Sequence, residues 1–230
     1  MAKFRVPHGF RLLRELLEGL PYGRVFTSEE AIDAGKRLGL TATHVHKLLS
    51  EMSEDGVVLT RARWGLYVMH PPFGGRDEVR PIAVAVRAAE PSAVSGQSAL
   101  AHWGLIDQAP LKFDTLATPT RPSWHTGVQH RGAFTRWVWD GPAFEYRRVP
   151  QREMFGIRDV RLDSETVVPM FDPERSVLEE LLMSPSTGAH ILAEHRDDLD
   201  IKRLHAYAQR AGRSATELVE QTLGRELIAA

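Results

Sequence analysis

The spacing of apolar and polar side chains over residues 27–69 predicts two helices followed by a β-hairpin. Residues 27–30 read Thr-Ser-Glu-Glu, a capping box in which a hydroxyl and a carboxylate each accept a hydrogen bond from the other residue's backbone amide. We expect a first helix over residues 28–38, ended by Gly39, and a second helix capped by Thr41. The apolar side chains of the second helix recur at helical spacing and share one face: Val45, Leu48, Leu49 and Met52.

The other face of the second helix carries side chains that form hydrogen bonds. Near the N-terminus of a recognition helix, such side chains reach base edges and phosphates in the major groove of DNA. The candidate DNA-binding residues of this helix are Thr41, Thr43, His44, His46, Lys47 and Ser50. The sequence therefore indicates a helix-turn-helix whose partner is double-stranded DNA.

Two β-rich segments at 57–59 and 66–69 predict the hairpin. Arg61 and Arg63 lie between these segments, where the guanidinium groups of a wing can bind phosphates or enter a minor groove. We interpret Trp64 as a residue that packs under the hairpin. The whole pattern is typical of a winged helix-turn-helix, and the alternative is a small helical domain that holds a protein partner.

Paired prolines and glycines at 71–75 predict an irregular connector, so we expect a winged-helix domain at 1–72 and a second domain at 78–230. The expected strands of the second domain lie near residues 134–138, 144–149, 160–162 and 166–170. The expected helices cover residues 82–89, 97–103, a segment that starts at Asp172, 201–211 and 214–223, with Gly104, Gly212 and Gly224 as helix ends. The predicted fold class is α+β, with a winged helix-turn-helix followed by a mixed sheet-and-helix domain that ends in a small helical bundle.

The composition is that of an ordinary globular protein, and it excludes several kinds of site. A chain of 230 residues with 43% hydrophobic residues can form one large domain or two modest ones. The absence of cysteine excludes disulfides, cysteine nucleophiles and thiolate metal sites. No apolar run approaches the roughly 20 residues that cross a bilayer, and residues 1–5 lead into no signal-peptide core. We therefore expect a cytoplasmic protein with no membrane partner.

The net charge of −1 is unevenly distributed along the chain. Residues 1–70 hold 10 Lys and Arg against 8 Asp and Glu, residues 71–161 hold 12 against 9, and residues 162–230 hold 7 against 13. The first two thirds can therefore face a polyanion. A further basic surface is a candidate in the middle of the chain, where Trp137 is assigned to the core. Its residues are Arg131, Arg136, Arg147 and Arg148.

The residues that could carry catalysis do not form a recognisable enzyme or cofactor site. His44 and His46 point in different directions on a helix, as do His190 and His195, and His125 and His130 lack a nearby pair of carboxylates. Asp200-Ile201-Lys202 matches part of a metal-dependent nuclease signature, but it stands at the start of a helical stretch. Neither a phosphate-binding P-loop nor a Gly-x-Ser-x-Gly elbow is present. We expect a non-enzymatic protein without a cofactor, with a nuclease that uses Asp200 and Lys202 as an alternative.

Three motifs follow one another along the chain. They are the end of the wing at 63–67 (RWGLY), residues 94–100 (VSGQSAL) leading into 103–105 (WGL), and residues 172–178 (DPERSVL). In this order they resemble the AbiEi family, the antitoxins of bacterial type IV toxin–antitoxin systems. The similarity covers most of the chain.

The resemblance implies a two-part protein. The N-terminal domain of such a protein represses its own operon by binding repeats in promoter DNA, and the C-terminal domain counters a nucleotidyltransferase-like toxin, with or without direct contact. Acidic residues between 194 and 200 are a candidate toxin-binding surface, or else the solvated start of a helix. The alternative function is a winged-helix transcriptional repressor whose C-terminal domain senses a small ligand.

Overall fold

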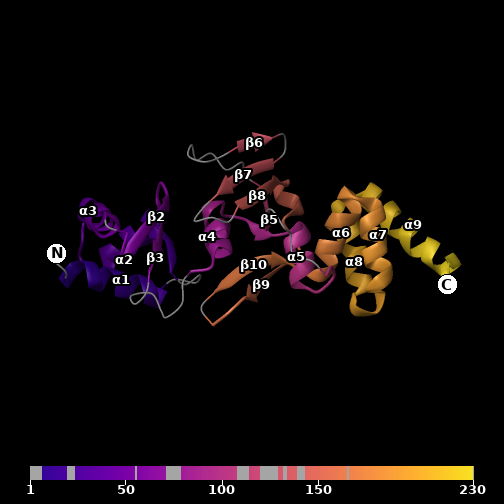
Figure 1. Cartoon of the computed structure of the whole chain (residues 1–230), viewed down its shortest axis with the longest axis horizontal. Helices are drawn as coiled ribbons and strands as arrows, with labels where there is room; N and C mark the ends of the chain where they lie inside the picture. Colours follow the sequence, from indigo (N-terminus) through magenta and orange to yellow (C-terminus); the bar gives the residue numbers. More distant parts are fainter. Residues whose placement is uncertain are drawn as a thin grey trace. The chain divides into compact units, whose positions relative to one another are not determined.

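The structure is a computed structural model that describes residues 7–19, 24–54, 56–70, 79–107, 114–119, 129–131, 134–138, 143–164 and 166–229 (Figure 1). It has the α+β fold that the sequence predicts. The chain forms two compact units. The first comprises mainly the residues up to Glu90, and the second begins at Pro91, with residues 161–168 returning to the first. None of the helices in the described ranges has both the length and the apolar character needed to cross a bilayer.

The first unit contains the two helices and the hairpin predicted for residues 27–69. Its elements are α1 (Pro7–Gly19), β1 (Val25–Thr27), α2 (Ser28–Arg37), α3 (Ala42–Ser53), β2 (Leu59–Arg63) and β3 (Leu66–Met69). The strands form an antiparallel sheet in the order β1-β3-β2. Thr27 Oγ1 accepts a hydrogen bond from the Glu30 amide at 3.2 Å, and Glu30 Oε2 accepts one from the Thr27 amide at 2.7 Å. The predicted capping box is thus confirmed.

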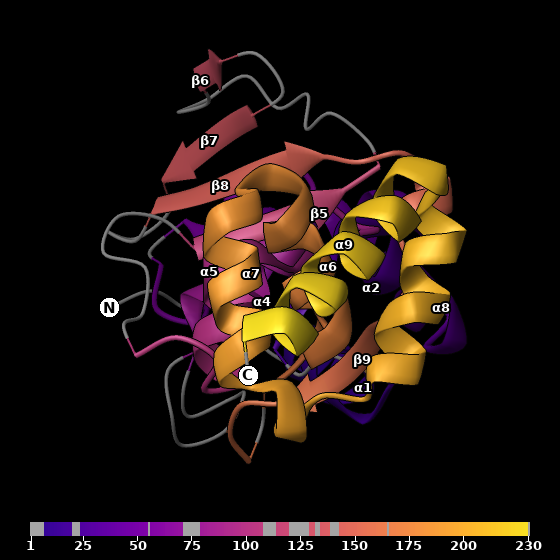
Figure 2. The ribbon, with the colours of Figure 1, turned by 90° about the vertical axis from the view of Figure 1, so that its right-hand side faces the viewer.

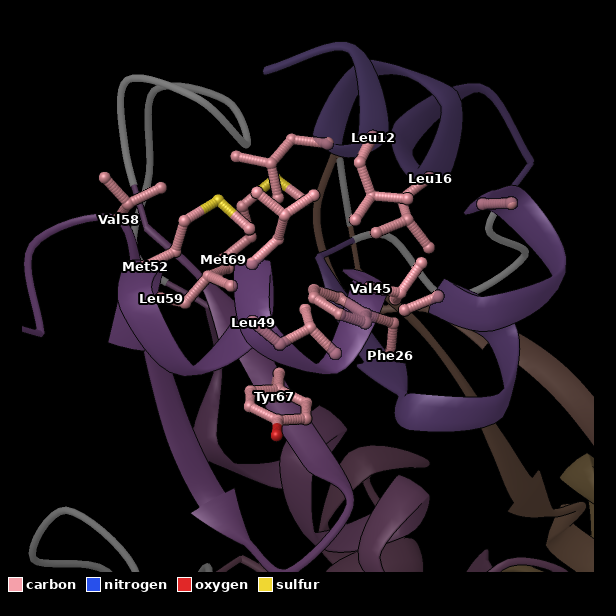
Figure 3. Close-up of a cluster of buried hydrophobic side chains, with 14 residues drawn as sticks. Leu12, Leu16, Phe26, Val45, Leu49, Met52, Val58, Leu59, Tyr67 and Met69 are labelled. Carbon is pink, nitrogen blue, oxygen red and sulfur yellow. The ribbon is translucent and has the colours of Figure 1, made fainter. Parts of the chain in front are cut away.

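One hydrophobic core holds the elements of the first unit together (Figure 3). Helix α1 contributes Leu12 to this core, and α3 contributes Val45 and Leu49. Phe26 of β1 stacks on Tyr67 of β3, with the two ring centroids 5.7 Å apart. Each fully buried side chain of this kind stabilises the fold by about 1.5–3 kcal/mol. Because α3 and the hairpin share this core, the polar face of α3 and the hairpin turn keep a fixed relation to each other.

Helix α4 (Pro81–Ala88) belongs to the first unit, which therefore extends beyond the boundary predicted at 72–78. The helix packs on β1 and β3, and its Arg87 forms an ion pair with Glu30 at 2.6 Å. Arg87 is only 5% exposed, and Glu30 also closes the capping box of α2. One carboxylate thus holds both the first turn of α2 and helix α4. The sequence predicted helix α4. The residues that α4 contacts in β1 and β3 lie far from it in the sequence, so these contacts could not be predicted.

The second unit is built around a mixed seven-stranded sheet in the order β6-β7-β8-β5-β4-β10-β9. Its strands are β4 (Ala93–Val94), β5 (Asp114–Thr118), β6 (Gln129–Arg131), β7 (Phe134–Val138), β8 (Ala143–Arg148), β9 (Ile157–Arg161) and β10 (Val167–Phe171). Strand β5 runs parallel to β8 and β4 runs parallel to β10, whereas β4–β5, β6–β7 and β7–β8 are antiparallel pairs. The strand predicted at 134–138 is confirmed. The one predicted at 160–162 begins earlier, at Ile157.

Helices α6–α9 form the C-terminal bundle of the second unit (Figure 2). The helices of this unit are α5 (Gly96–His102), α6 (Pro173–Met183), α7 (Pro185–Glu194), α8 (Ile201–Ala211) and α9 (Arg213–Ala229), with short 3-10 helices at Gln151–Glu153 and Arg196–Asp198. The bounds predicted for α8 are confirmed, but α7 was not predicted, because its Pro-Ser-Thr-Gly start has the composition of a loop. The helix end predicted at Gly224 is wrong. Helix α9 continues through this residue, whereas Gly212 has a φ of 123° and does end α8.

Candidate nucleic-acid interface

Helix α3 presents its polar face to solvent. Its predicted apolar stripe is buried in the core, and Thr41 Oγ1 accepts a hydrogen bond from the His44 amide at 3.3 Å, so the predicted cap is confirmed. Fixing the first turn in this way satisfies a backbone donor that the helix itself leaves unpaired. The six residues predicted to contact DNA are all exposed: Thr41, Thr43, His44, His46, Lys47 and Ser50.

The position of α3 depends on a close contact with α2. A Cβ atom added to Gly35 of α2 would lie 2.3 Å from Cγ2 of Val45 on α3. Both residues are completely or almost completely buried, so the contact lies inside the core rather than at its edge. Only glycine lets the two helices approach this closely. The residue at position 35 therefore sets where the polar face of α3 lies.

We expect Gly35→Ala to lower the free energy of unfolding of the first unit by about 1–2 kcal/mol. Overpacking a core costs about 1–3 kcal/mol, and the better helix propensity of alanine offsets part of that loss. Val45→Ala creates room for the new methyl group, so the double variant is expected to lose less stability than the two single losses added together. Urea denaturation of the four proteins measures this coupling. Strict additivity would contradict the close contact.

Lys47 is the one lysine on the exposed face of α3. Its Nζ lies 3.8 Å from Oε1 of Glu51 one turn later, and the two side chains are 73% and 54% exposed. An ion pair this exposed is weak, because water competes for both charges. Lys47 can therefore exchange its contact with Glu51 for a phosphate oxygen at little cost.

The hairpin differs from its prediction in where the turn lies. Strand β2 continues through Arg61 to Arg63, so both arginines belong to the strand and the turn consists of Trp64 and Gly65. Gly65 has a φ of 75°, a backbone conformation that favours glycine. Arg63 Nη1 donates a hydrogen bond to the backbone oxygen of Trp64 at 2.9 Å, whereas Arg61 is exposed. Arg61 is thus the arginine that the strand offers to a ligand, and Arg63 braces the turn.

Trp64 does not pack under the hairpin, and that interpretation is wrong. Its side chain is 83% exposed, and Cζ of Arg61 lies 5.3 Å from the centroid of its ring. A tryptophan among β-rich residues is typical of a core position. Trp64, however, lies in the turn between β2 and β3. Because β2 runs to Arg63, Trp64 is the first residue of the hairpin turn.

Of the four arginines proposed as a second basic surface, the structure describes the side chains of Arg147 and Arg148. Arg147 forms an ion pair with Glu179, and the two side chains are 18% and 1% exposed. Burial lowers the pKa of Arg147, while the charge of Glu153 opposes that shift. Arg148 is exposed, and Arg131 and Arg136 lie on β6 and β7 with side chains outside the described part of the structure. Trp137 is buried, as expected. Arg147 is therefore a largely buried partner of Glu179, and Arg148 remains exposed.

The VSGQSAL motif has a structural role in the second unit. The amide of Gly96 donates a hydrogen bond to Oε2 of Glu179 at 2.7 Å. Ser98 Oγ accepts a hydrogen bond from the amide of Thr115 at 2.9 Å, which ties α5 to β5. Ser98 thus has a structural role at the contact between α5 and β5. The motif joins three elements and leaves no reactive group exposed at Ser98.

The DPERSVL motif is equally structural. Asp172 caps α6 by accepting a hydrogen bond from the Arg175 amide at 2.9 Å, and it also accepts one from the Tyr207 hydroxyl at 2.8 Å. Burial, together with this hydrogen bond, raises the pKa of Tyr207 to about 12. The guanidinium of Arg175 lies over the rings of Phe155 and Phe171. These contacts bind the start of α6 to α8 and to the end of β10.

The residues of the nuclease and acidic-surface hypotheses lie at helix ends. Asp200 caps α8 by accepting a hydrogen bond from the Arg203 amide at 3.0 Å, and its own amide donates to Glu174. Asp198 lies 3.6 Å from His195, and Glu194 pairs with His190 at 3.7 Å. In the part of the chain that the structure describes, no three acidic or histidine side chains are grouped to hold a metal ion. Glu194, Asp198 and Asp200 thus have partners close to them in the sequence, at the end of α7 and the beginning of α8.

Comparison with known proteins gives a fold but no family. No protein-family model matches the chain, and no curated protein matches it. The crystal structure of the Rv2827c protein from Mycobacterium tuberculosis resembles it with a TM-score of 0.52 and 18% sequence identity, over 96% of this chain and 78% of that chain. At this identity the likeness shows a shared fold alone.

Proposed function

We propose that the first unit binds double-stranded DNA through α3 and the β2–β3 wing. The observation that carries this proposal is the pairing of two exposed features on one rigid core: the polar face of α3 and Arg61 on the wing. Helix α3 has the length and the polar residues to enter a major groove. Arg61 then contacts the backbone or the adjacent minor groove.

We further propose that the chain is an antitoxin of the AbiEi type. In this role it represses its own operon through repeats in the promoter and counters a nucleotidyltransferase-like toxin encoded beside it. The proposal draws on the order of the three motifs along the sequence. Two of these motifs hold elements of the second unit together. No residue of the chain is assigned a catalytic role.

Removing the charges of Lys47 and Arg61 together is expected to weaken binding to the chain's own promoter duplex and to flatten its salt dependence. Each lost phosphate contact lowers the slope of log K against log salt by about 1. Fluorescence anisotropy at several salt concentrations measures both quantities. Lys36→Ala is a single-charge control, because Lys36 is 67% exposed, close to the 73% of Lys47, and lies on α2, where it pairs with Asp33. If the double variant and this control had equal slopes of log K against log salt, the DNA interface would not include Lys47 and Arg61.

Arg63 belongs in the same series as a separate variant. The guanidinium of Arg63 also donates a hydrogen bond to the backbone of the turn, so Arg63→Ala removes this hydrogen bond and the charge together. Arg63→Lys keeps the charge and changes the hydrogen bond.

Co-expression with the product of the adjacent gene tests the antitoxin role. If that product is toxic, growth should be rescued both by the full chain and by the full chain with Lys47→Ala and Arg61→Ala. Rescue by both separates toxin neutralisation from DNA binding. Failure of both against a confirmed toxin would leave a winged-helix regulator and reject the antitoxin proposal.

A further inference from the structure

The turn of the β2–β3 hairpin presents a large aromatic ring to solvent. Trp64 is 83% exposed, more than any other large hydrophobic residue whose side chain the structure describes; Val57 follows at 62%. Tryptophan is highly buried on average in folded proteins. The aromatic rings on the strands of this sheet, Phe26 and Tyr67, are buried in the core. Trp64, in the turn between β2 and β3, is therefore open to a partner.

The backbone that carries Trp64 is held in place. Arg63 Nη1 donates a hydrogen bond to the Trp64 oxygen, and the Gly65 oxygen accepts a hydrogen bond from the Ser28 amide at 2.9 Å. A register shift in β2 between Arg61 and Arg63 accompanies this tight turn. An ordered turn loses little conformational freedom when it binds a partner, so more of the contact energy appears as affinity.

Arg61 adds a positive charge next to the ring. Its Cζ lies 5.3 Å from the ring centroid, within the range of a cation–π contact, and its side chain is exposed. The wing therefore offers an apolar ring and a cation side by side. DNA offers the complementary pair, since anionic phosphates alternate with the apolar faces of sugars and bases. A protein surface could also receive a tryptophan, but the cation and the neighbouring polar face of α3 favour a polyanion.

We propose that Trp64 is a DNA-contacting residue of the wing, with its indole against the sugars and base edges of a minor groove and Arg61 beside it at the phosphates. This inference rests on the proposed DNA-binding function and deepens it. An apolar contact releases no counterions, so the affinity that it adds does not fall as salt rises. The two wing residues thus make separable contributions: Arg61 a salt-dependent one, and Trp64 a salt-independent one.

The test uses the full chain and the duplex that lies immediately upstream of its own gene. The affinity of the wild type is compared with the affinities of Trp64→Ala, Trp64→Phe and Arg61→Ala over a series of salt concentrations. Trp64→Ala is expected to weaken binding about tenfold at every salt concentration without changing the slope, because the lost contact buries apolar surface and releases no counterions. Trp64→Phe keeps most of the affinity. Arg61→Ala lowers the slope by about 1.

Iodide quenching of tryptophan fluorescence gives a second readout. Bound duplex should protect a fraction of the wild-type emission, and this protected fraction should be missing in Trp64→Phe. The thermal midpoint of Trp64→Ala serves as the folding control and should stay unchanged, because the side chain is exposed.

The outcomes separate this inference from the proposed function. Tight binding by the wild type with equal affinity for Trp64→Ala would overturn the contact while leaving DNA binding in place. No binding by the wild type would overturn both. Loss of self-association in Trp64→Ala, with DNA affinity unchanged, would also overturn the contact and assign the ring to a second copy of the chain.

Discussion

Replacing Glu179 by alanine is expected to lower the free energy of unfolding of the second unit by about 3–5 kcal/mol. Glu179 is 1% exposed and serves two partners: one carboxylate oxygen accepts from the Gly96 amide at 2.7 Å, and the other pairs with Arg147. Its removal leaves a largely buried guanidinium without its closest counter-charge and a buried amide without an acceptor. Such a loss is a large share of the 5–15 kcal/mol that stabilises a typical domain.

Two further variants separate the charge from the hydrogen bond. Glu179→Gln keeps an oxygen that can accept a hydrogen bond from the Gly96 amide but loses the negative charge. The stability of this variant should therefore lie between the stability of the wild type and that of the alanine variant. Adding Arg147→Met to Glu179→Ala removes the uncompensated cation and should recover part of the loss. Hydrogen exchange of the α6 amides reports the stability of this unit separately from that of the first unit. Unchanged exchange in Glu179→Ala would contradict the role assigned to the ion pair.

Gly188→Ala is expected to lower the stability of the second unit by about 3 kcal/mol or more. A Cβ atom at this position on α7 would lie 2.5 Å from both N and Cα of Leu181 on α6. Because these are backbone atoms, no rotation of a side chain relieves the overlap, and the two helices must separate. Leu181 is fully buried, so separation also opens the core of the helical bundle.

A matched control lies in the same bundle. Gly224 is also a helical glycine, and an added Cβ would have no heavy atom within 4 Å. Gly224→Ala should therefore raise stability by up to about 1 kcal/mol through helix propensity alone. Urea denaturation followed by circular dichroism compares the two variants. A small effect of the same sign in both would show that α6 and α7 lie farther apart than described.

Local sequence signals predicted the helix-turn-helix well. The starts of α2 and α3 follow from short-range chemistry, since the Thr27 and Thr41 hydroxyls bond amides three residues later. The buried stripe of α3 follows from helical periodicity. The spacing of the apolar residues identifies the apolar face of the helix, whichever element that face packs against. These features depend on residues within one or two turns, so a single sequence contains the needed information.

The wing shows where local signals stop being sufficient. The β-rich residues around it predicted a hairpin, but the register of β2 against β3 decides which residues form the turn. That register placed Arg61 on the strand, turned Arg63 back to brace the backbone and left Trp64 at the tip. The sequence identified the candidate arginines and misplaced the tryptophan.

The α+β class, the capped helices of the first unit and the exposed face of α3 could be predicted from the sequence alone, because each follows from contacts between near neighbours in the chain. The strand order of the large sheet, the burial of Arg147 against Glu179 and the approach of α7 to α6 at Gly188 are visible only in the folded protein. Those features join residues that are separated along the chain and meet only after packing. Their energies depend on burial and distance, which no local pattern of residue types specifies.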